Sequence, residues 1–130
     1  MRPIAITLTA LILATPASAG APMSAAEFEA YVTGKTLTYS SGGVPYGVEE
    51  YLSGRRVLWQ FLGSDCQAGE WYPEGEMICF IYDAIDGPQC WTFFKEATGL
   101  RALFMNDSEQ TELYETDERN QSLICPNFGA

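Results

Sequence analysis

The stretch ICFIYDAIDGPQCW, residues 78–91, contains two cysteines eleven positions apart, each within an apolar run, with a loop between the runs. A two-residue hairpin turn directly before Pro88 would need a backbone N–H at that position, and proline has none. The sequence therefore favours a wider loop, about residues 82–87, and this register sets Cys79 opposite Cys90. Directly opposite residues of an antiparallel pair have Cα atoms roughly 4.5 to 5.5 Å apart, within reach of a disulfide. We predict two antiparallel strands joined by this bond.

The chain has four cysteines, which permit three pairings. If Cys79 bonds to Cys90, then Cys66 bonds to Cys125 and ties the C-terminal tail to the rest of the fold. A zinc site and a redox pair are the alternatives. However, the cysteine spacings of 13, 11 and 35 contain no C-x-x-C motif, and the chain has no histidine. An oxidising compartment favours two structural disulfides.

Turn signals rich in Gly, Pro, Asn and Asp recur about every ten residues after Lys35, a spacing typical of an antiparallel meander. Several runs between them, such as 57–62 and 77–82, are apolar on both faces. An open sheet would leave one of these faces in water, whereas a closed barrel hides more of it and removes the sheet edges. We therefore predict a mainly β fold, either a small antiparallel up-and-down barrel or a strongly curved meander of about eight strands, stapled by disulfides. The strands are expected near residues 36–41, 45–52, 55–62, 68–72, 76–82, 90–95, 100–105 and 110–115.

One N-terminal helix is expected over residues 24–33. Ser24 and Glu27 have the S-x-x-E spacing of a capping box, in which each side chain pairs with a backbone N–H at the helix start. Phe28 and Val32 fall on one face of this helix, four residues apart, so we expect that face to pack on the sheet.

Residues 1–19 have the features of a signal peptide: one positive charge, an apolar stretch too short for a membrane anchor, and an A-x-A cleavage site at 17–19. Cleavage before Gly20 would leave 111 residues, which we expect to form a single β-barrel-like domain over 20–130. No cysteine follows the cleavage site directly, so we expect a soluble periplasmic or secreted protein. The polar tail after Tyr114 is expected to be loose until Cys125 fixes it.

The chain carries 17 acidic and 7 basic side chains, a net charge of −10 at pH 7, and loss of Arg2 with the leader moves it to −11. A field of this sign repels nucleic-acid phosphates and anionic lipids, so we expect neither nucleic-acid binding nor membrane insertion. It attracts cationic proteins, and a cationic enzyme such as a lysozyme is one such partner. The alternative is that the charge only keeps an exported protein in solution.

The lack of histidine excludes Ser-His-Asp and Cys-His catalysis and imidazole metal centres. The chain also lacks G-x-S-x-G, Walker and G-x-G-x-x-G motifs, and the acidic loops at 83–87 and 106–109 lack the ligand spacing of calcium loops. We therefore predict no catalytic residue, no metal and no cofactor. Catalysis by paired carboxylates on a glycan is the enzymatic alternative, unless these acids are simply hydrated on turns and outward strand positions. The acids concerned are Asp65, Glu70, Glu74, Glu76, Asp83 and Asp86.

Aromatic side chains on the expected strands outnumber those that a small barrel needs inside. One interpretation is an aromatic-lined cavity for an apolar ligand. The other is a filled core with aromatic pairs outside, which is favoured because small barrels normally fill with side chains. Trp59, Trp71, Trp91 and Tyr82 are the candidate ligand or partner contacts.

The segments GEWYPEGEMICFIYD and GPQCWTFF resemble a family of small secreted proteobacterial proteins that carry a domain of unknown function. The shared pattern is G-x-W, a turn, an aliphatic-Cys-aromatic strand and a Cys-aromatic strand, and the resemblance implies no activity. A lipocalin-like barrel is a more distant resemblance. The lipocalin G-x-W lies on the first strand whereas this one follows several strands, so no binding residues are carried over. The matching residues are Gly69, Trp71, Ile78, Cys79, Phe80, Cys90 and Trp91.

These observations together predict a non-catalytic exported binding module. Such a module would inhibit a cationic enzyme or carry a small apolar ligand. Two alternatives come from other classes of protein. One is a carboxylate-based glycan hydrolase, which needs two acids in one cleft, and the other is a structural envelope component, which needs an exposed apolar patch for docking.

Overall fold

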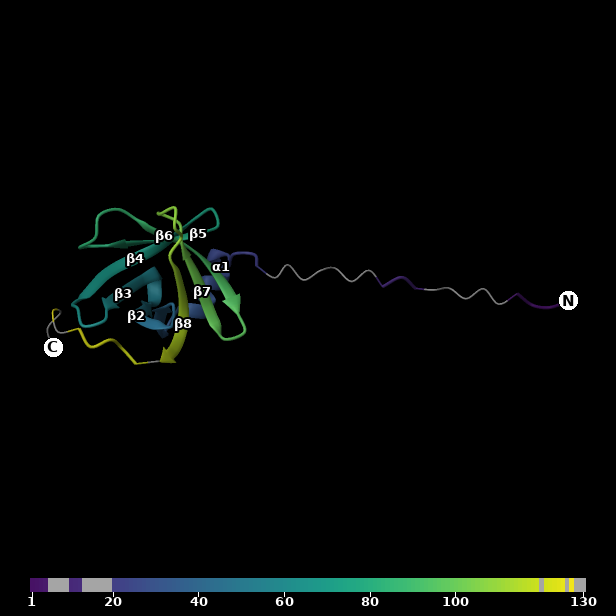
Figure 1. Ribbon diagram of the computed structural model, residues 1–130, viewed down its shortest axis with the longest axis horizontal. Coiled ribbons are helices and arrows are strands. Elements are labelled where there is room, and N and C mark those ends of the chain that lie inside the picture. The colour runs from purple at the N-terminus through teal and green to yellow at the C-terminus, as the bar shows by residue number, and fades with distance from the viewer. Residues whose placement is uncertain (5–9, 13–19, 120, 126, 128–130) are drawn as a thin grey trace.

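The computed structural model describes residues 1–4, 10–12, 20–119, 121–125 and 127. In this part of the chain, one helix is followed by eight antiparallel strands that close into an up-and-down barrel (Figure 1). The predicted mainly β fold with one N-terminal helix is confirmed, and of its two predicted forms the closed barrel is the one present. The elements are α1 (Ala25–Val32), β1 (Thr36–Ser41), β2 (Val44–Leu52), the 3-10 turn η1 (Ser53–Arg55), β3 (Arg56–Phe61), β4 (Cys66–Glu74), β5 (Met77–Tyr82), β6 (Gln89–Glu96), β7 (Gly99–Phe104) and β8 (Glu112–Arg119).

The barrel closes where β8 pairs with β1, from Ser40 opposite Tyr114 to Thr36 opposite Arg119. The prediction of a loose tail directly after Tyr114 is therefore wrong for residues 115–119, which form the second half of β8. These residues are too polar to look like a strand, but β1 needs a hydrogen-bonded neighbour along its whole length. The hydrogen bonds that this segment makes with β1 therefore outweigh its own weak propensity to form a strand.

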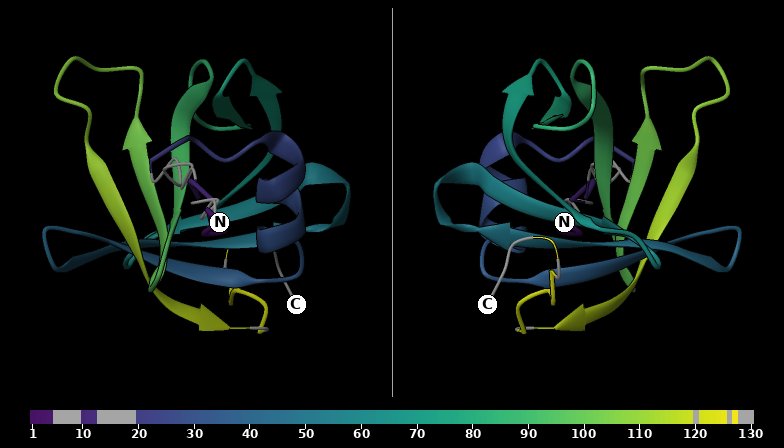
Figure 2. Two further views of the ribbon diagram at one scale, coloured as in Figure 1. Left: turned by 90° about the vertical axis from the view of Figure 1, so that its right-hand side faces the viewer. Right: turned by 90° about the vertical axis from the view of Figure 1, so that its left-hand side faces the viewer.

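Helix α1 covers one end of the barrel, and the predicted capping box is present. Glu27 N–H donates to the Ser24 hydroxyl and Ser24 N–H donates to the Glu27 carboxylate, both at 3.1 Å. Phe28 and Val32 are fully buried, so the helix supplies apolar side chains to the interior at this end. Figure 2 shows α1 at this end of the barrel, away from the β7–β8 loop. The rings around Phe28 are those of Tyr51, Trp71, Phe80 and Phe93.

Both predicted disulfides are present. Cys79 lies directly opposite Cys90 in the β5–β6 ladder, with the Cα atoms 4.0 Å apart, so the wide loop before Pro88 sets the register as expected. Cys66 bonds to Cys125 with a Cα separation of 5.5 Å and holds the C-terminal segment against the start of β4. Two disulfides are typical of proteins from an oxidising compartment.

The predicted signal peptide covers residues 1–19, of which 5–9 and 13–19 lie outside the described residues. Export of the chain therefore stays a prediction. None of the helices formed by the described residues is long and apolar enough to span a membrane.

Removal of either disulfide should lower the free energy of unfolding, because each bond restricts the unfolded chain. The loop-entropy relation gives about 4 kcal/mol for the bond that spans 59 residues and about 3 kcal/mol for the bond that spans 11. Urea unfolding of the Cys66→Ser/Cys125→Ser and Cys79→Ser/Cys90→Ser variants, beside the wild type, measures both losses. Free thiols in the mature protein, or a double variant as stable as the wild type, would contradict this prediction.

Candidate functional site

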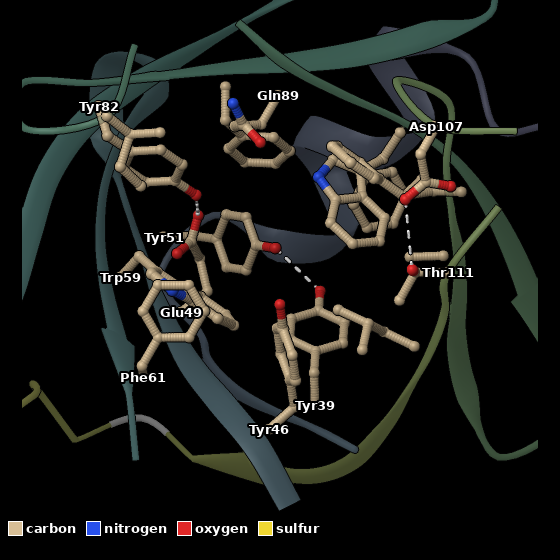
Figure 3. Close-up of a pocket in the computed structure, with 17 residues that line it drawn as sticks. Tyr39, Tyr46, Glu49, Tyr51, Trp59, Phe61, Tyr82, Gln89, Asp107 and Thr111 are labelled. Carbon is tan, nitrogen blue, oxygen red and sulfur yellow. Dashed lines mark hydrogen bonds between the residues drawn. The ribbon is translucent and has the colours of Figure 1, made fainter. Parts of the chain in front are cut away.

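The interior of the barrel contains a cavity of about 240 Å³ at the end opposite α1. Ile85 in the β5–β6 loop, and Asp107 and Thr111 in the β7–β8 loop, lie at its mouth. Small barrels usually fill their interior with side chains, so a cavity of this size is a specific feature of this chain. Most of the wall is aromatic (Figure 3). The rings are those of Tyr39, Tyr46, Tyr51, Trp59, Phe61, Phe80, Tyr82, Trp91, Phe93 and Phe104.

Two glycines allow large rings to lie flat against the barrel wall. Gly47 on β2 pairs with Phe61 on β3, and a Cβ there would clash with the Trp59 indole. Gly69 on β4 pairs with Tyr82, and a Cβ there would lie 2.8 Å from Cδ1 of the Tyr82 ring. Gly69 is the glycine of the G-x-W pattern, so part of that pattern serves to place Tyr82 in the cavity wall.

Glu49 is an acidic side chain in this aromatic wall. It lies on β2 opposite Trp59 of β3, and its exposed fraction is only 2%. The Tyr82 hydroxyl donates to its Oε1 atom at 2.7 Å, while Oε2 has no hydrogen-bond partner among the described residues (Figure 3). Burial raises the pKa of the Glu49 carboxyl to about 8, against the opposing effect of the Tyr82 hydrogen bond. The carboxyl is therefore mostly protonated at neutral pH.

Two tyrosines extend the polar part of the wall. The hydroxyls of Tyr39 on β1 and Tyr51 on β2 form a hydrogen bond of 2.8 Å (Figure 3). Burial raises the pKa of both hydroxyls, and that of Tyr82, well above the ordinary value of 10.0. All three therefore stay neutral and can donate or accept hydrogen bonds. The cavity combines an apolar body with a few polar groups, the usual composition of a small-molecule site.

The loops around the mouth carry charge of one sign. Residues 42–43, 62–65, 83–88 and 105–111 connect the strands at this end, and these described loops contain acids but no lysine or arginine. In contrast, the lysines and arginines between residues 20 and 118 belong to the half of the barrel that α1 closes: Lys35, Arg55, Arg56, Lys95 and Arg101. We call the five mouth acids the acidic rim: Asp65, Asp83, Asp86, Asp107 and Glu109.

The structure brings three of the four candidate contact residues together. Trp59, Trp91 and Tyr82 line the cavity. Trp71 does not, because its ring packs edge-on against Phe28 at 5.2 Å and lies under the Arg55 guanidinium at 4.6 Å, at the end that α1 covers. The six acids proposed for glycan hydrolysis, residues 65, 70, 74, 76, 83 and 86, are all exposed on loops and strand surfaces. Within the described residues, no group of three or more His, Cys, Asp or Glu side chains is arranged to hold a metal ion.

Glu49 is the functional candidate that the sequence analysis missed. The signal was the pair of consecutive acids at 49 and 50 in a segment otherwise typical of a strand. Successive side chains on a strand point to opposite faces, so one of the two acids had to face the interior of a closed barrel. Glu50 in turn accepts a hydrogen bond from the Leu123 N–H at 3.0 Å, which fastens the C-terminal segment to the outside.

The raised pKa of Glu49 predicts how stability depends on pH. Between the ordinary value of 4.5 and the folded value of about 8, the folded state keeps a proton that the unfolded state has lost. The free energy of unfolding of the wild type should therefore fall as pH rises through this window, by roughly 4 kcal/mol at most. In Glu49→Gln this loss is absent. The free energy of unfolding of the variant, measured by urea unfolding, should therefore rise relative to that of the wild type between about pH 5 and about pH 8. A difference that stays constant with pH would contradict the assignment.

In comparisons with known proteins, the chain has no significant match to a family model, a curated protein or a solved structure. The resemblance of residues 69–83 and 87–94 to small secreted proteobacterial proteins therefore stays a prediction.

Proposed function

We propose that this protein is an exported, non-catalytic binding protein that encloses a small ligand with an apolar body inside its barrel. The observation that carries this proposal is the aromatic cavity of about 240 Å³ with a mouth at the end opposite α1. Burial of apolar ligand surface against ten rings would provide most of the binding energy. The Glu49 carboxyl and the hydroxyls of Tyr39, Tyr51 and Tyr82 would orient the ligand.

The size of the cavity sets the size of the ligand. Pockets for drug-sized molecules have volumes of roughly 300–1,000 Å³, and this cavity is slightly smaller. A body of one or two fused rings, or a short alkyl chain, suits it. A longer substituent would extend through the mouth between the β5–β6 and β7–β8 loops.

A binding role fits the rest of the chain better than hydrolysis does. The six acids first considered for glycan cleavage are exposed, so none of them forms a pair inside the cavity. Glu49 and Asp107 are the acids of the cavity lining, and Figure 3 shows them on opposite sides of the hollow. Two disulfides and the predicted leader suit a protein that works outside the cytoplasm.

Filling the cavity should abolish binding without unfolding the protein. Ala102 on β7 lines the cavity and is 1% exposed, so Ala102→Leu adds bulk to the space a ligand would take. The probes are 1-naphthylmethanol and 1-naphthylmethylamine, a neutral and a cationic molecule with the same aromatic body, and binding is measured by calorimetry. We expect saturable binding of at least one probe to the wild type, and at least about tenfold weaker binding to the variant.

Leu103→Phe is the matched control, because it adds bulk at the next residue of the same strand, where the side chain faces outward. This control should bind like the wild type. Lack of binding of both probes, or equal binding by Ala102→Leu, would overturn the proposed function.

A second candidate function, inhibition of a cationic enzyme, is favoured by the acidic rim and the net charge of −10. Long-range attraction between opposite charges is screened by salt, so such binding should weaken as salt rises. The test is inhibition of a lysozyme by the wild type and by Asp83→Asn/Asp86→Asn, at low and high salt. Glu74→Gln/Glu76→Gln removes the same charge at the other end of the barrel and is the control. Inhibition that depends on salt and on the rim variant would support this candidate, and an absence of inhibition would exclude it for lysozymes.

A further inference from the structure

We propose that the ligand of the cavity is an organic cation, an amine whose apolar body lies among the rings and whose ammonium group pairs with the carboxyl of Glu49. This inference rests on the proposed binding function and names the chemical class of the ligand. Three independent features support it: a buried carboxyl with no basic partner, walls made of aromatic rings, and a rim of negative charge.

The first feature is the state of Glu49. A buried carboxyl normally has its oxygens hydrogen-bonded or paired with a base. Here Oε1 accepts from Tyr82, but Oε2 has no partner among the described residues. The seventeen described lining residues include the acids Glu49 and Asp107 and no lysine or arginine. The described lining residues therefore supply no cation to this cavity, and an ammonium group on the ligand would complete the pair.

The second feature is the arrangement of the rings. Tyr46, Trp59 and Phe61 form one cluster, with ring centroids 5.3 to 5.9 Å apart. Trp91 and Phe104 form another, with centroids 4.8 Å apart. The faces of such rings attract a cation, most strongly for tryptophan, and the same faces bury the apolar part of an amine. One set of side chains thus suits both ends of an amphipathic cation.

The third feature is the acidic rim. All five of its carboxylates are exposed on the loops that surround the mouth. Their field repels anionic ligands and raises the local concentration of cations at the entrance. A neutral ligand would gain nothing from the rim and would form no ion pair with the Glu49 carboxyl. Of the three charge classes, only a cation benefits from every part of the site.

Pairing with an ammonium group couples binding to the release of a proton. Burial raises the pKa of Glu49 to about 8, so near neutral pH the carboxyl gives up its proton to solvent when the ammonium arrives and forms the carboxylate. The other titratable groups that line the cavity are Tyr39, Tyr46, Tyr51, Tyr82 and, at the mouth, Asp107. Burial raises the pKa values of Tyr39, Tyr51 and Tyr82 well above the ordinary value, so these three hydroxyls do not titrate in this window. Affinity for an amine should therefore rise with pH up to about 8.

The experiment compares 1-naphthylmethylamine with 1-naphthylmethanol, which differ in charge but share the aromatic body. Calorimetry measures both affinities for the disulfide-bonded wild type, for Glu49→Gln and for Glu70→Gln. Glu70 is exposed on the outer face of β4, so Glu70→Gln makes the same substitution outside the cavity. We expect the wild type and Glu70→Gln to prefer the amine by at least about tenfold, and Glu49→Gln to bind both probes within about threefold of each other.

A second measurement uses only the wild type, so it does not depend on the folding of a variant. Amine affinity should rise between about pH 6 and about pH 8 with release of a proton, seen as a dependence of the binding heat on buffer ionisation, while alcohol affinity stays constant. Equal affinity for both probes, an amine preference retained by Glu49→Gln, or an amine affinity independent of pH would overturn this inference and leave the proposed binding function standing. If neither probe binds to the wild type, the proposed function itself fails.

Discussion

The hydrogen-bonded pairing of β1 with β8 is the constraint on which the rest of the structure depends. It joins residues about eighty positions apart and turns a meander into a closed wall. Closure gives every strand an inner and an outer face, and it removes the sheet edges that would otherwise pair with other chains. Without the β1–β8 pairing, the inward-facing rings would be exposed to solvent and the Glu49 carboxyl would be hydrated. The two disulfides fix neighbouring parts of this wall, one within the β5–β6 hairpin and one between β4 and the tail.

One end of the barrel interior is filled with side chains, and the other end contains the cavity. At one end, Phe28 of α1 fills the barrel among a group of rings, and the Tyr31 hydroxyl donates to Glu115 at 2.9 Å to hold the helix on β8. Glu115 also accepts from the Leu100 N–H at 2.7 Å, so this buried acid has its partners within the protein. At the other end, the described part of the chain places no helix inside the barrel, and the side chains leave a cavity. Glu115 and Glu49 are both buried but differ in their partners, since Glu115 is hydrogen-bonded within the fold, whereas Oε2 of Glu49 has no hydrogen-bond partner among the described residues.

Much of the fold could be predicted from the sequence because its signals are local. The turn spacing, the capping box at Ser24 and the effect of Pro88 on register each depend on a few neighbouring residues. The end of β8 could not be predicted, because residues 115–119 are polar and become a strand only through the distant β1 edge. The sequence suggested both a cavity and a filled core and favoured the filled core, because the choice depends on how the Trp59 and Tyr82 rings approach Gly47 and Gly69. The position of Trp71 at the end covered by α1 could not be predicted either, because the sequence does not show how far along the barrel axis a side chain lies.

Helix α1 closes one end of the barrel, and the cavity lined by the described residues lies at the other end. Tyr46 and Phe61 line the cavity and are exposed near the open end, and Glu49 lies further along β2 from Tyr46. An amine of the class proposed above would then enter with its ammonium group first. A site of this kind would select for the ammonium group and the apolar part next to it, and it would tolerate variation in any part that extends out of the mouth.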